Sequence, residues 1–180
     1  LLAAANIEAK LSLAILDSTD PQQVALAAEQ YPPDKSLYIL ASKSGGTAEL
    51  LAAFDYFWEL SKGNGTRFVV TTDAGSSLEK LAKDRGFRKV FNADPNVGGR
   101  FSALTYFGLV PAALLGMDIP RLLDSAERMK KQSEKDVPAA RNPGFALGAL
   151  LAESALAGRD KLTILADAPV SAFAGWIEQV

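Results

Sequence analysis

The sequence predicts an α/β fold, in which a three-layer, doubly wound, mostly parallel sheet is flanked by helices. Short apolar runs of strand length alternate along the chain with longer segments whose apolar residues recur at helical spacing. Residues that favour helix starts, such as Asp, Ser and Thr, stand between the two kinds of segment. With 180 residues, of which 48% are hydrophobic and 22% charged, the chain is large enough for one domain with a full core.

Five apolar runs are predicted to be strands. Because helical segments separate them, we expect neighbouring strands to pair in parallel through right-handed crossovers, with helices covering the sheet. The predicted strands are residues 11–16, 37–41, 68–72, 89–91 and 162–166.

Two helices are predicted between the first three strands. The first, over residues 20–31, starts at Asp20 as its N-cap and has Pro21 at its first helical position. The second, over residues 47–62, follows a loop rich in hydroxyls and glycines and ends at the glycines that follow it. Each helix is thus bounded by residues that start or stop helices.

A third helix is predicted over residues 76–86. The residues just before it, 73–77, look like a phosphate-binding loop. However, Ser76 and Glu79 complete a capping box, which explains these residues by helix initiation alone. We therefore assign this segment to structure.

The second half of the chain is predicted to be mainly helical. The uncharged run at residues 101–117 is shorter than a usual membrane span and contains Gly and Pro, which favours a pair of core helices. Helices are also predicted at residues 120–131, 142–157 and 170–180, with a polar loop at residues 132–140.

Charge and composition exclude several classes of function. The net charge of −2 gives no excess of positive charge that would attract nucleic acid or an anionic membrane. The chain has no cysteine and no histidine, which removes disulfides, Ser-His-Asp hydrolysis and nearly all zinc chemistry. A general base would have to be Glu, Asp, Lys or Tyr.

The clearest functional signal is the loop at residues 42–49, between a predicted strand and a predicted helix. Ligands of parallel sheets bind outside the carboxyl ends of the strands, and N–H groups at a helix start attract anions. We therefore predict a site for the phosphate of a small metabolite. Its polar side chains are Ser42, Lys43, Ser44 and Thr47, and the glycines that leave the backbone accessible are Gly45 and Gly46.

Two points about this loop stay open. Thr47 or Ser44 could simply cap the helix, although three hydroxyls and two glycines exceed what capping requires. Glu49, in the first helical turn, either complements the helix dipole or contacts the sugar and positions a water. The loop matches neither a Walker motif nor Gly-x-Gly-x-x-Gly.

A second candidate site is the segment at residues 96–102. Gly98 and Gly99 place accessible backbone beside Arg100, whose planar guanidinium carries five donors. Such a group can stabilise an oxyanion that develops during a reaction. The alternative is an arginine that pairs with a surface carboxylate.

The chain is similar to phosphoglucose isomerases, within the larger family of sugar-isomerase (SIS) domains, over nearly all of its length. The resemblance implies a flavodoxin-like SIS fold, with residues 1–180 forming a single domain that is part of a longer chain. It is carried by four motifs, at residues 16–21, 42–49, 98–102 and 108–113.

For the phosphate, the resemblance implies that Ser42, Ser44 and Thr47 bind the substrate phosphate, with Lys43 and the loop N–H groups assisting. Ser44 stands where the commonest family pattern has Thr, but it keeps the hydroxyl. The resemblance also implies that neither metal nor organic cofactor takes part.

For the reacting carbons, the resemblance implies that Arg100 stabilises the enediolate formed as a proton moves between C1 and C2. Gly99 contributes backbone near these carbons, while Gly45, Gly46 and Glu49 line the substrate site. The family's catalytic Glu follows the helix that begins near the end of this chain, and its ring-opening His and C-terminal Lys lie further on. A glycine-serine phosphate motif expected upstream is also missing. We therefore expect this chain to bind phosphosugar but to be inactive alone.

The intact enzyme is expected to interconvert glucose 6-phosphate and fructose 6-phosphate in glycolysis and gluconeogenesis, as a cytoplasmic homodimer. The sequence around Arg100 is similar to that of the phosphoglucose isomerases that are fused to a transaldolase in some bacteria, so a transaldolase could share the parent chain. Two rivals are a non-catalytic SIS module that senses a phosphosugar and a purely structural α/β module. Acceptance of mannose 6-phosphate stays open.

Overall fold

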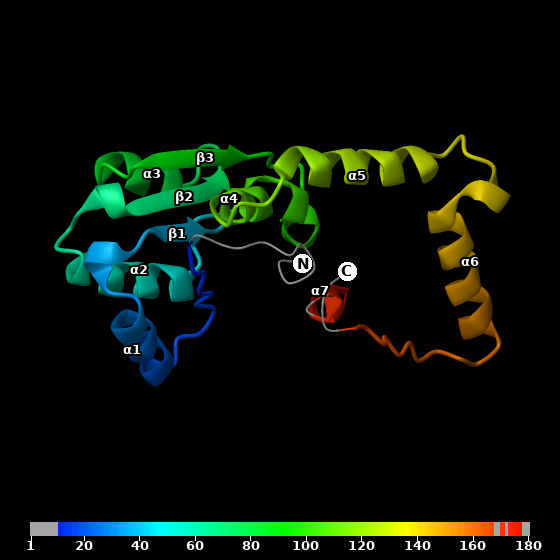
Figure 1. Cartoon of the computed structure of the whole chain (residues 1–180), viewed down its shortest axis with the longest axis horizontal. Helices are drawn as coiled ribbons and strands as arrows, with labels where there is room; N and C mark the ends of the chain where they lie inside the picture. The colour runs from blue at the N-terminus through cyan, green and yellow to red at the C-terminus, as the bar shows by residue number, and fades with distance from the viewer. Residues whose placement is uncertain (1–10, 168–169, 172, 178–180) are drawn as a thin grey trace. The chain divides into compact units, whose positions relative to one another are not determined.

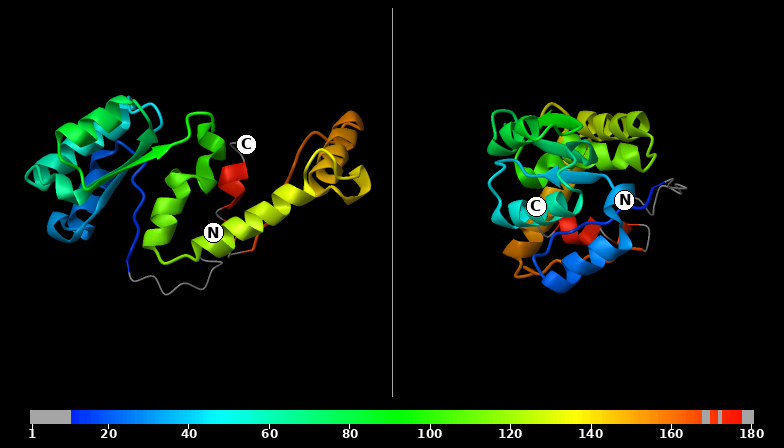
Figure 2. Two further views of the ribbon diagram at one scale, coloured as in Figure 1. Left: turned by 90° about the horizontal axis from the view of Figure 1, so that it is seen from above. Right: turned by 90° about the vertical axis from the view of Figure 1, so that its left-hand side faces the viewer.

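The computed structural model describes residues 11–167, 170–171 and 173–177. They fall into two compact units, one within residues 8–116 and one within residues 117–179, and each unit is described by itself. The first unit contains the sheet with its helices, and the second contains helices only, as Figures 1 and 2 show. The assignment of residues 1–180 to a single domain stays a prediction.

The sheet of the first unit has three parallel strands in the order β1-β2-β3. They are β1 (Tyr38–Ala41), β2 (Phe68–Asp73) and β3 (Lys89–Ala93). The predicted strands at residues 37–41, 68–72 and 89–91 are therefore confirmed, with β2 and β3 slightly longer than predicted. Because the strands are parallel and adjacent, their carboxyl ends lie at one edge of the sheet.

Helices connect and cover these strands. The α-helices of this unit are α1 (Pro21–Gln30), α2 (Ala48–Leu60), α3 (Ser77–Asp84) and α4 (Tyr106–Leu114). Short 3₁₀ helices are η2 (Pro33–Lys35), η3 (Gly65–Arg67) and η4 (Gly99–Leu104). The first three predicted helices are confirmed, and the apolar run at residues 101–117 forms most of η4 and α4.

One face of the sheet packs against α2 and α3. Leu40 and Val70, which are partners across β1 and β2, share a buried cluster with Phe57 of α2 and Leu78 of α3. The predicted N-cap of α1 is confirmed, since an Asp20 carboxylate oxygen accepts from two N–H groups of the first turn. Several α1 residues pack against the outside of the cluster.

Phe68 is the centre of this core. Its side chain has 0% exposure, and its ring lies 4.9 Å from that of Tyr38, 5.5 Å from Phe54 and 5.3 Å from Phe87, centroid to centroid. Trp58 adds a fourth ring, at 5.5 Å. Because aromatic pairs at these distances add to the free energy gained by burial, this cluster fixes α2 against the sheet.

Helix α4 covers the opposite face. Val90 packs against the core cluster, so the next residue of β3, Phe91, points the other way. Its ring lies 5.4 Å from that of Tyr106 in α4, and α4 contacts both β2 and β3. Helices therefore flank both faces of the parallel sheet, as the predicted α/β fold class requires.

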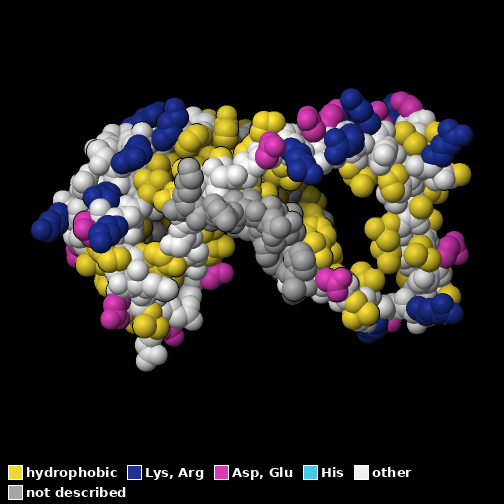
Figure 3. Space-filling view, in the orientation of Figure 1, with side chains coloured by type: hydrophobic (Ala, Val, Ile, Leu, Met, Phe, Trp, Pro, Cys, Tyr) yellow, Lys and Arg dark blue, Asp and Glu magenta, His cyan; other side chains and the backbone are white. Residues whose placement is uncertain are grey.

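The second unit contains α5 (Ile119–Gln132), η5 (Ala139–Arg141), α6 (Pro143–Leu156) and α7 (Phe173–Ile177). The predicted helices at residues 120–131 and 142–157 are confirmed, and the predicted loop at residues 132–140 contains the last residue of α5 and the start of η5. Part of the predicted helix at residues 170–180 lies outside the described residues. Large apolar side chains are exposed on α6, where Figure 3 shows them as a yellow strip, at Phe145, Leu147, Leu150, Leu151 and Leu156.

Two predicted strands are wrong. Residues 11–16 and 162–166 have no strand structure and pair with no strand among the described residues. Ile15 is 79% exposed and Leu165 is 92% exposed. A strand needs a neighbour that takes up its backbone N–H and C=O groups, and an apolar run in the sequence does not say whether that neighbour is present.

The cap of α3 confirms that residues 73–77 start a helix, with one difference from the predicted capping box. Ser76 Oγ accepts from the Glu79 N–H at 3.1 Å, but a Glu79 oxygen accepts from the N–H of Gly75, at 2.6 Å. The other oxygen of Glu79 pairs with Lys83 at 2.6 Å. The hydrogen bond from Lys83, followed by that from Gly75, lowers the pKa of Glu79 from 4.5 to about 2.

We expect Glu79→Gln to remove a pH-dependent part of the stability. In the folded protein Glu79 stays ionised down to about pH 2, whereas its usual pKa is 4.5, so between these values the unfolded chain binds more protons. The extra free energy of unfolding of the wild type should be complete above the usual pKa and should disappear as pH falls toward 2. Urea unfolding over this pH range measures it.

Glu29→Gln, which removes an exposed carboxylate on α1, is the matched control and should follow the wild-type pH profile. A difference between the wild type and Glu79→Gln that is the same at every pH would contradict the assignment.

Candidate functional site

The predicted anion loop leaves the sheet at the carboxyl end of β1. The N–H of Ser42 donates to the carbonyl of Thr71 at 3.2 Å, and the N–H of Asp73 donates to the carbonyl of Lys43 at 3.2 Å. The hydrogen bonds between β1 and β2 thus continue past the end of β1 into the loop. The sheet itself therefore fixes where the loop begins.

A buried hydroxyl organises the turn of the loop. Ser42 is 8% exposed, its Oγ accepts from the N–H of Gly45 at 3.1 Å, and it lies 3.0 Å from Oγ1 of Thr47. Ser44, which is exposed, accepts from the N–H of Gly46 at 3.3 Å. Ser42, Ser44 and Thr47 are therefore brought together in one turn.

The loop hydroxyls do not cap α2. Thr47 occupies the N-cap position, but its side chain makes no capping hydrogen bond and instead contacts Ser42. By contrast, the N-cap side chains of α1 and α3 both accept from N–H groups of their own helices. The partial positive charge at the start of α2 is thus presented to the space in front of the loop.

The two glycines of the loop have different surroundings. Gly45 has a φ of 75°, and a Cβ there would lie 2.6 Å from the backbone nitrogen of Leu78 in α3. A Cβ at Gly46 would meet nothing within 4 Å. Gly45 is therefore explained by the close approach of the loop to α3, and Gly46 is the glycine that leaves open space.

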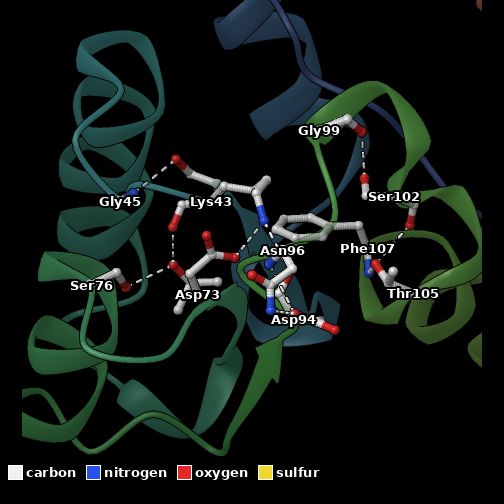
Figure 4. A network of polar contacts seen from close by, with 12 residues as sticks. Lys43, Gly45, Asp73, Ser76, Asp94, Asn96, Gly99, Ser102, Thr105 and Phe107 are labelled. Carbon is white, nitrogen blue, oxygen red and sulfur yellow. Dashed lines mark hydrogen bonds and ion pairs between the residues drawn. The ribbon is translucent and has the colours of Figure 1, made fainter.

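The side chain of Lys43 runs along the ends of the strands. Its ammonium lies 2.8 Å from a carboxylate oxygen of Asp73 and donates to the carbonyl of Asp94 at 3.3 Å. It also lies 6.0 Å from the centre of the Phe107 ring in α4. Figure 4 shows the ammonium among these three groups. Its positive charge is thus already shared with β2 and with the segment after β3.

The second candidate segment passes close to this lysine. A Cβ at Gly99 would be 3.9 Å from Cδ of Lys43. Ser102 Oγ donates to the carbonyl of Gly99 at 2.6 Å, and Thr105 Oγ1 donates to the carbonyl of Ser102 at 2.7 Å, so hydroxyls order this turn. Arg100, the next residue of η4, is exposed. The anion loop and the Gly99–Arg100 segment are therefore neighbours.

Glu49 lies at a separate hollow of the same unit. This cavity, of about 380 Å³, lies between α2 and the segment that leads into α1. Glu49 lines it together with Ser18 and Thr19. These two hydroxyls were missed as site residues from the sequence, although they belong to the motif at residues 16–21.

The sequence did not predict that these groups would hold Lys43. Asp73, Asp94 and Phe107 are far from it along the chain, and only the sheet topology brings them together. Asp73 had a signal, since it follows a predicted strand directly. In the described part of the chain, no group of three or more acidic side chains could hold a metal ion, and no helix could cross a membrane.

Comparisons with known proteins identify the family of the chain. A sequence model of the family described as "Phosphoglucose isomerase" matches residues 2–179. A protein of Carboxydothermus hydrogenoformans named glucose-6-phosphate isomerase is 40% identical over 126 residues, which cover 67% of this chain and 27% of that protein. One of Mycoplasmopsis pulmonis with the same name is 44% identical over 93 residues, covering 48% of this chain and 22% of that protein.

Two solved structures share the fold of this chain. A hypothetical protein from Thermus thermophilus superposes with a TM-score of 0.78 and 32% identity, over 84% of this chain and 37% of that one. A glucose-6-phosphate isomerase from Chlamydia trachomatis superposes with a TM-score of 0.66 and 24% identity, over 73% and 26%, which supports the fold. The chain spans about a quarter of the length of the curated relatives. The family match covers nearly every residue, and the chain therefore belongs to the phosphoglucose isomerase family.

Proposed function

We propose that this chain is the part of a glucose-6-phosphate isomerase that holds the substrate phosphate and the stabilising arginine. The intact enzyme would interconvert glucose 6-phosphate and fructose 6-phosphate. The observation that carries the proposal is the uncapped hydroxyl loop at the start of α2, in contact with the segment that leads to Arg100. The relatives named glucose-6-phosphate isomerase supply the substrate class.

The phosphate would lie in front of α2. Ser44, the exposed hydroxyl of the loop, and Thr47, at the helix start, would donate to its oxygens together with the N–H groups of the first turn. Ser42 is buried and already contacts Gly45 and Thr47, so it would act mainly by holding the turn.

The sugar carbons would extend from the phosphate toward Gly99 and Arg100. A base takes the proton from C2 of the open-chain aldose and returns it to C1, while a proton moves between the two oxygens. Negative charge develops on those oxygens in the enediolate, and the guanidinium of Arg100 would stabilise it, with Gly99 backbone alongside. Glu49 lines the hollow that it shares with Ser18 and Thr19, and we propose that the substrate site extends to it. The base would come from the rest of a longer parent chain, so residues 1–180 alone would bind without turnover.

The wider assignments rest on the family resemblance. We propose a single SIS domain over residues 1–180, a homodimeric parent enzyme and a cytoplasmic location. A transaldolase in the same parent chain is supported only by the amino-acid sequence around Arg100.

Fructose 6-phosphate should bind this chain more tightly than unphosphorylated fructose. Ser44→Ala should weaken the binding of fructose 6-phosphate by about ten- to a hundredfold, because a hydrogen bond to a charged group contributes about 1.5–3 kcal/mol. Titration followed by NMR chemical shifts or by calorimetry measures both effects.

The control is Ser61→Ala at the other end of α2, where the hydroxyl donates to the carbonyl of Trp58 and should not matter to the ligand. Equal, negligible binding of both sugars by the wild type would count against the loop as a phosphate site.

Arg100→Met should lower kcat of the longer parent enzyme by about 10²–10³, the loss typical of removing a donor to a developing oxyanion, and should change KM little. Arg128→Met on α5, where the guanidinium contacts Ser125, is the control and should leave both constants near wild type.

A rise in KM with unchanged kcat would place Arg100 in ground-state binding. A longer chain that carries the catalytic Glu motif but cannot isomerise either hexose phosphate would favour the phosphosugar sensor instead.

A further inference from the structure

Lys43 is the cation within the proposed phosphate loop, and its charge is already compensated. Its ammonium and the carboxylate of Asp73 are 2.8 Å apart, and their side chains are 24% and 21% exposed. The two opposite charges of this part-buried pair largely cancel, so the pair has no net charge with which to attract an anionic ligand. The carbonyl of Asp94 takes a second hydrogen bond from the same ammonium.

The pair is also tied to the loop through the backbone. The carbonyl of Lys43 accepts from the N–H of Asp73 and from Oγ1 of Thr72, each at 3.2 Å. Thr72 in turn shares a hydrogen bond of 2.7 Å with Ser76, the N-cap of α3. The backbone of Asp73 is therefore held next to the loop whether or not Lys43 neutralises the carboxylate.

The stem of Lys43 connects the loop to the segment before Arg100. Cδ of Lys43 lies close to Gly99, because a Cβ added there would be 3.9 Å from it. The ammonium holds the carbonyl of Asp94, and the carboxylate of Asp94 accepts from the backbone N–H of Asn96 at 2.9 Å. Lys43 thus holds the start of the segment at Asp94, and its stem passes close to Gly99.

We propose that Lys43 is a positioning residue rather than a phosphate ligand. With Asp73 it forms a neutral strut that fixes the phosphate loop relative to Gly99 and Arg100, and phosphate is held by hydroxyls and N–H groups. This inference rests on the proposed function. It differs from the expectation that the Lys43 charge assists phosphate binding.

A charge cycle in the longer parent enzyme tests this inference, with Lys43→Met, Asp73→Asn and the double variant. Binding of inorganic phosphate and the constants kcat and KM for fructose 6-phosphate are measured for each. Lys43→Met should weaken phosphate binding roughly five- to tenfold, because it leaves the Asp73 carboxylate unpaired beside the anion. The double variant should return phosphate affinity to within about threefold of wild type, since neutrality is restored.

The kcat of the double variant should stay at least about tenfold low, because the strut is still missing and Arg100 is no longer held in place. Lys43→Arg keeps the charge and should retain more of kcat than Lys43→Met does. Thermal unfolding of each variant shows that it is folded, and Asp73→Asn with Lys43→Arg carries the test if Lys43→Met does not fold.

The outcomes separate the two proposals. A double variant that binds phosphate as weakly as Lys43→Met would contradict the claim that Lys43 is not a phosphate ligand, since Lys43 would then act on phosphate directly. A double variant with wild-type kcat would overturn its positioning role. If the wild type itself neither binds phosphate nor turns over fructose 6-phosphate, the proposed function fails, whatever the variants do.

Discussion

The rest of the site depends on backbone hydrogen bonds that continue past the end of β1. The N–H of Ser42 donates to the carbonyl of Thr71, and the N–H of Asp73 donates to the carbonyl of Lys43. These backbone bonds alone set the position of the loop along β2, independently of its side chains. A parallel sheet provides this continuation at its carboxyl edge, where the chain leaves one strand beside the end of the next. The hydroxyls and the start of α2 are then placed by the sheet.

Packing on the covered face holds the far side of the loop. Phe54 of α2 packs against Phe68, and Phe57 of α2 against Tyr38, so the aromatic core sets the axis of α2 and the direction of its N-terminus. Gly45 presses the loop against α3 so closely that a Cβ would overlap Leu78. The loop is therefore fixed on three sides, by β2, α2 and α3. Such preorganisation lets hydroxyl and N–H donors bind an anion without first being ordered.

Much of this arrangement could be predicted from the sequence. The parts that could not be predicted have one physical cause in common. Strand and helix type in the first unit depend on local periodicity and caps, as at Asp20 and Ser76, and local patterns predicted them. The strands expected at residues 11–16 and 162–166 depend on a partner elsewhere, which periodicity does not report. Likewise, the pairing of Lys43 with Asp73 joins residues that only the strand order brings together.

A loop that binds through dipoles suits the reaction that we propose. The phosphate is unchanged between aldose and ketose, so tighter phosphate binding stabilises substrate, transition state and product alike and does not by itself raise kcat. Its use is to hold the reacting carbons in position, and that depends on a fixed distance from the loop to Arg100. In our proposal the side chain that spans this distance is Lys43, which is anchored on Asp73 and on the carbonyl of Asp94 and passes close to Gly99. A lysine free to follow the phosphate would bind more strongly but would not set that distance.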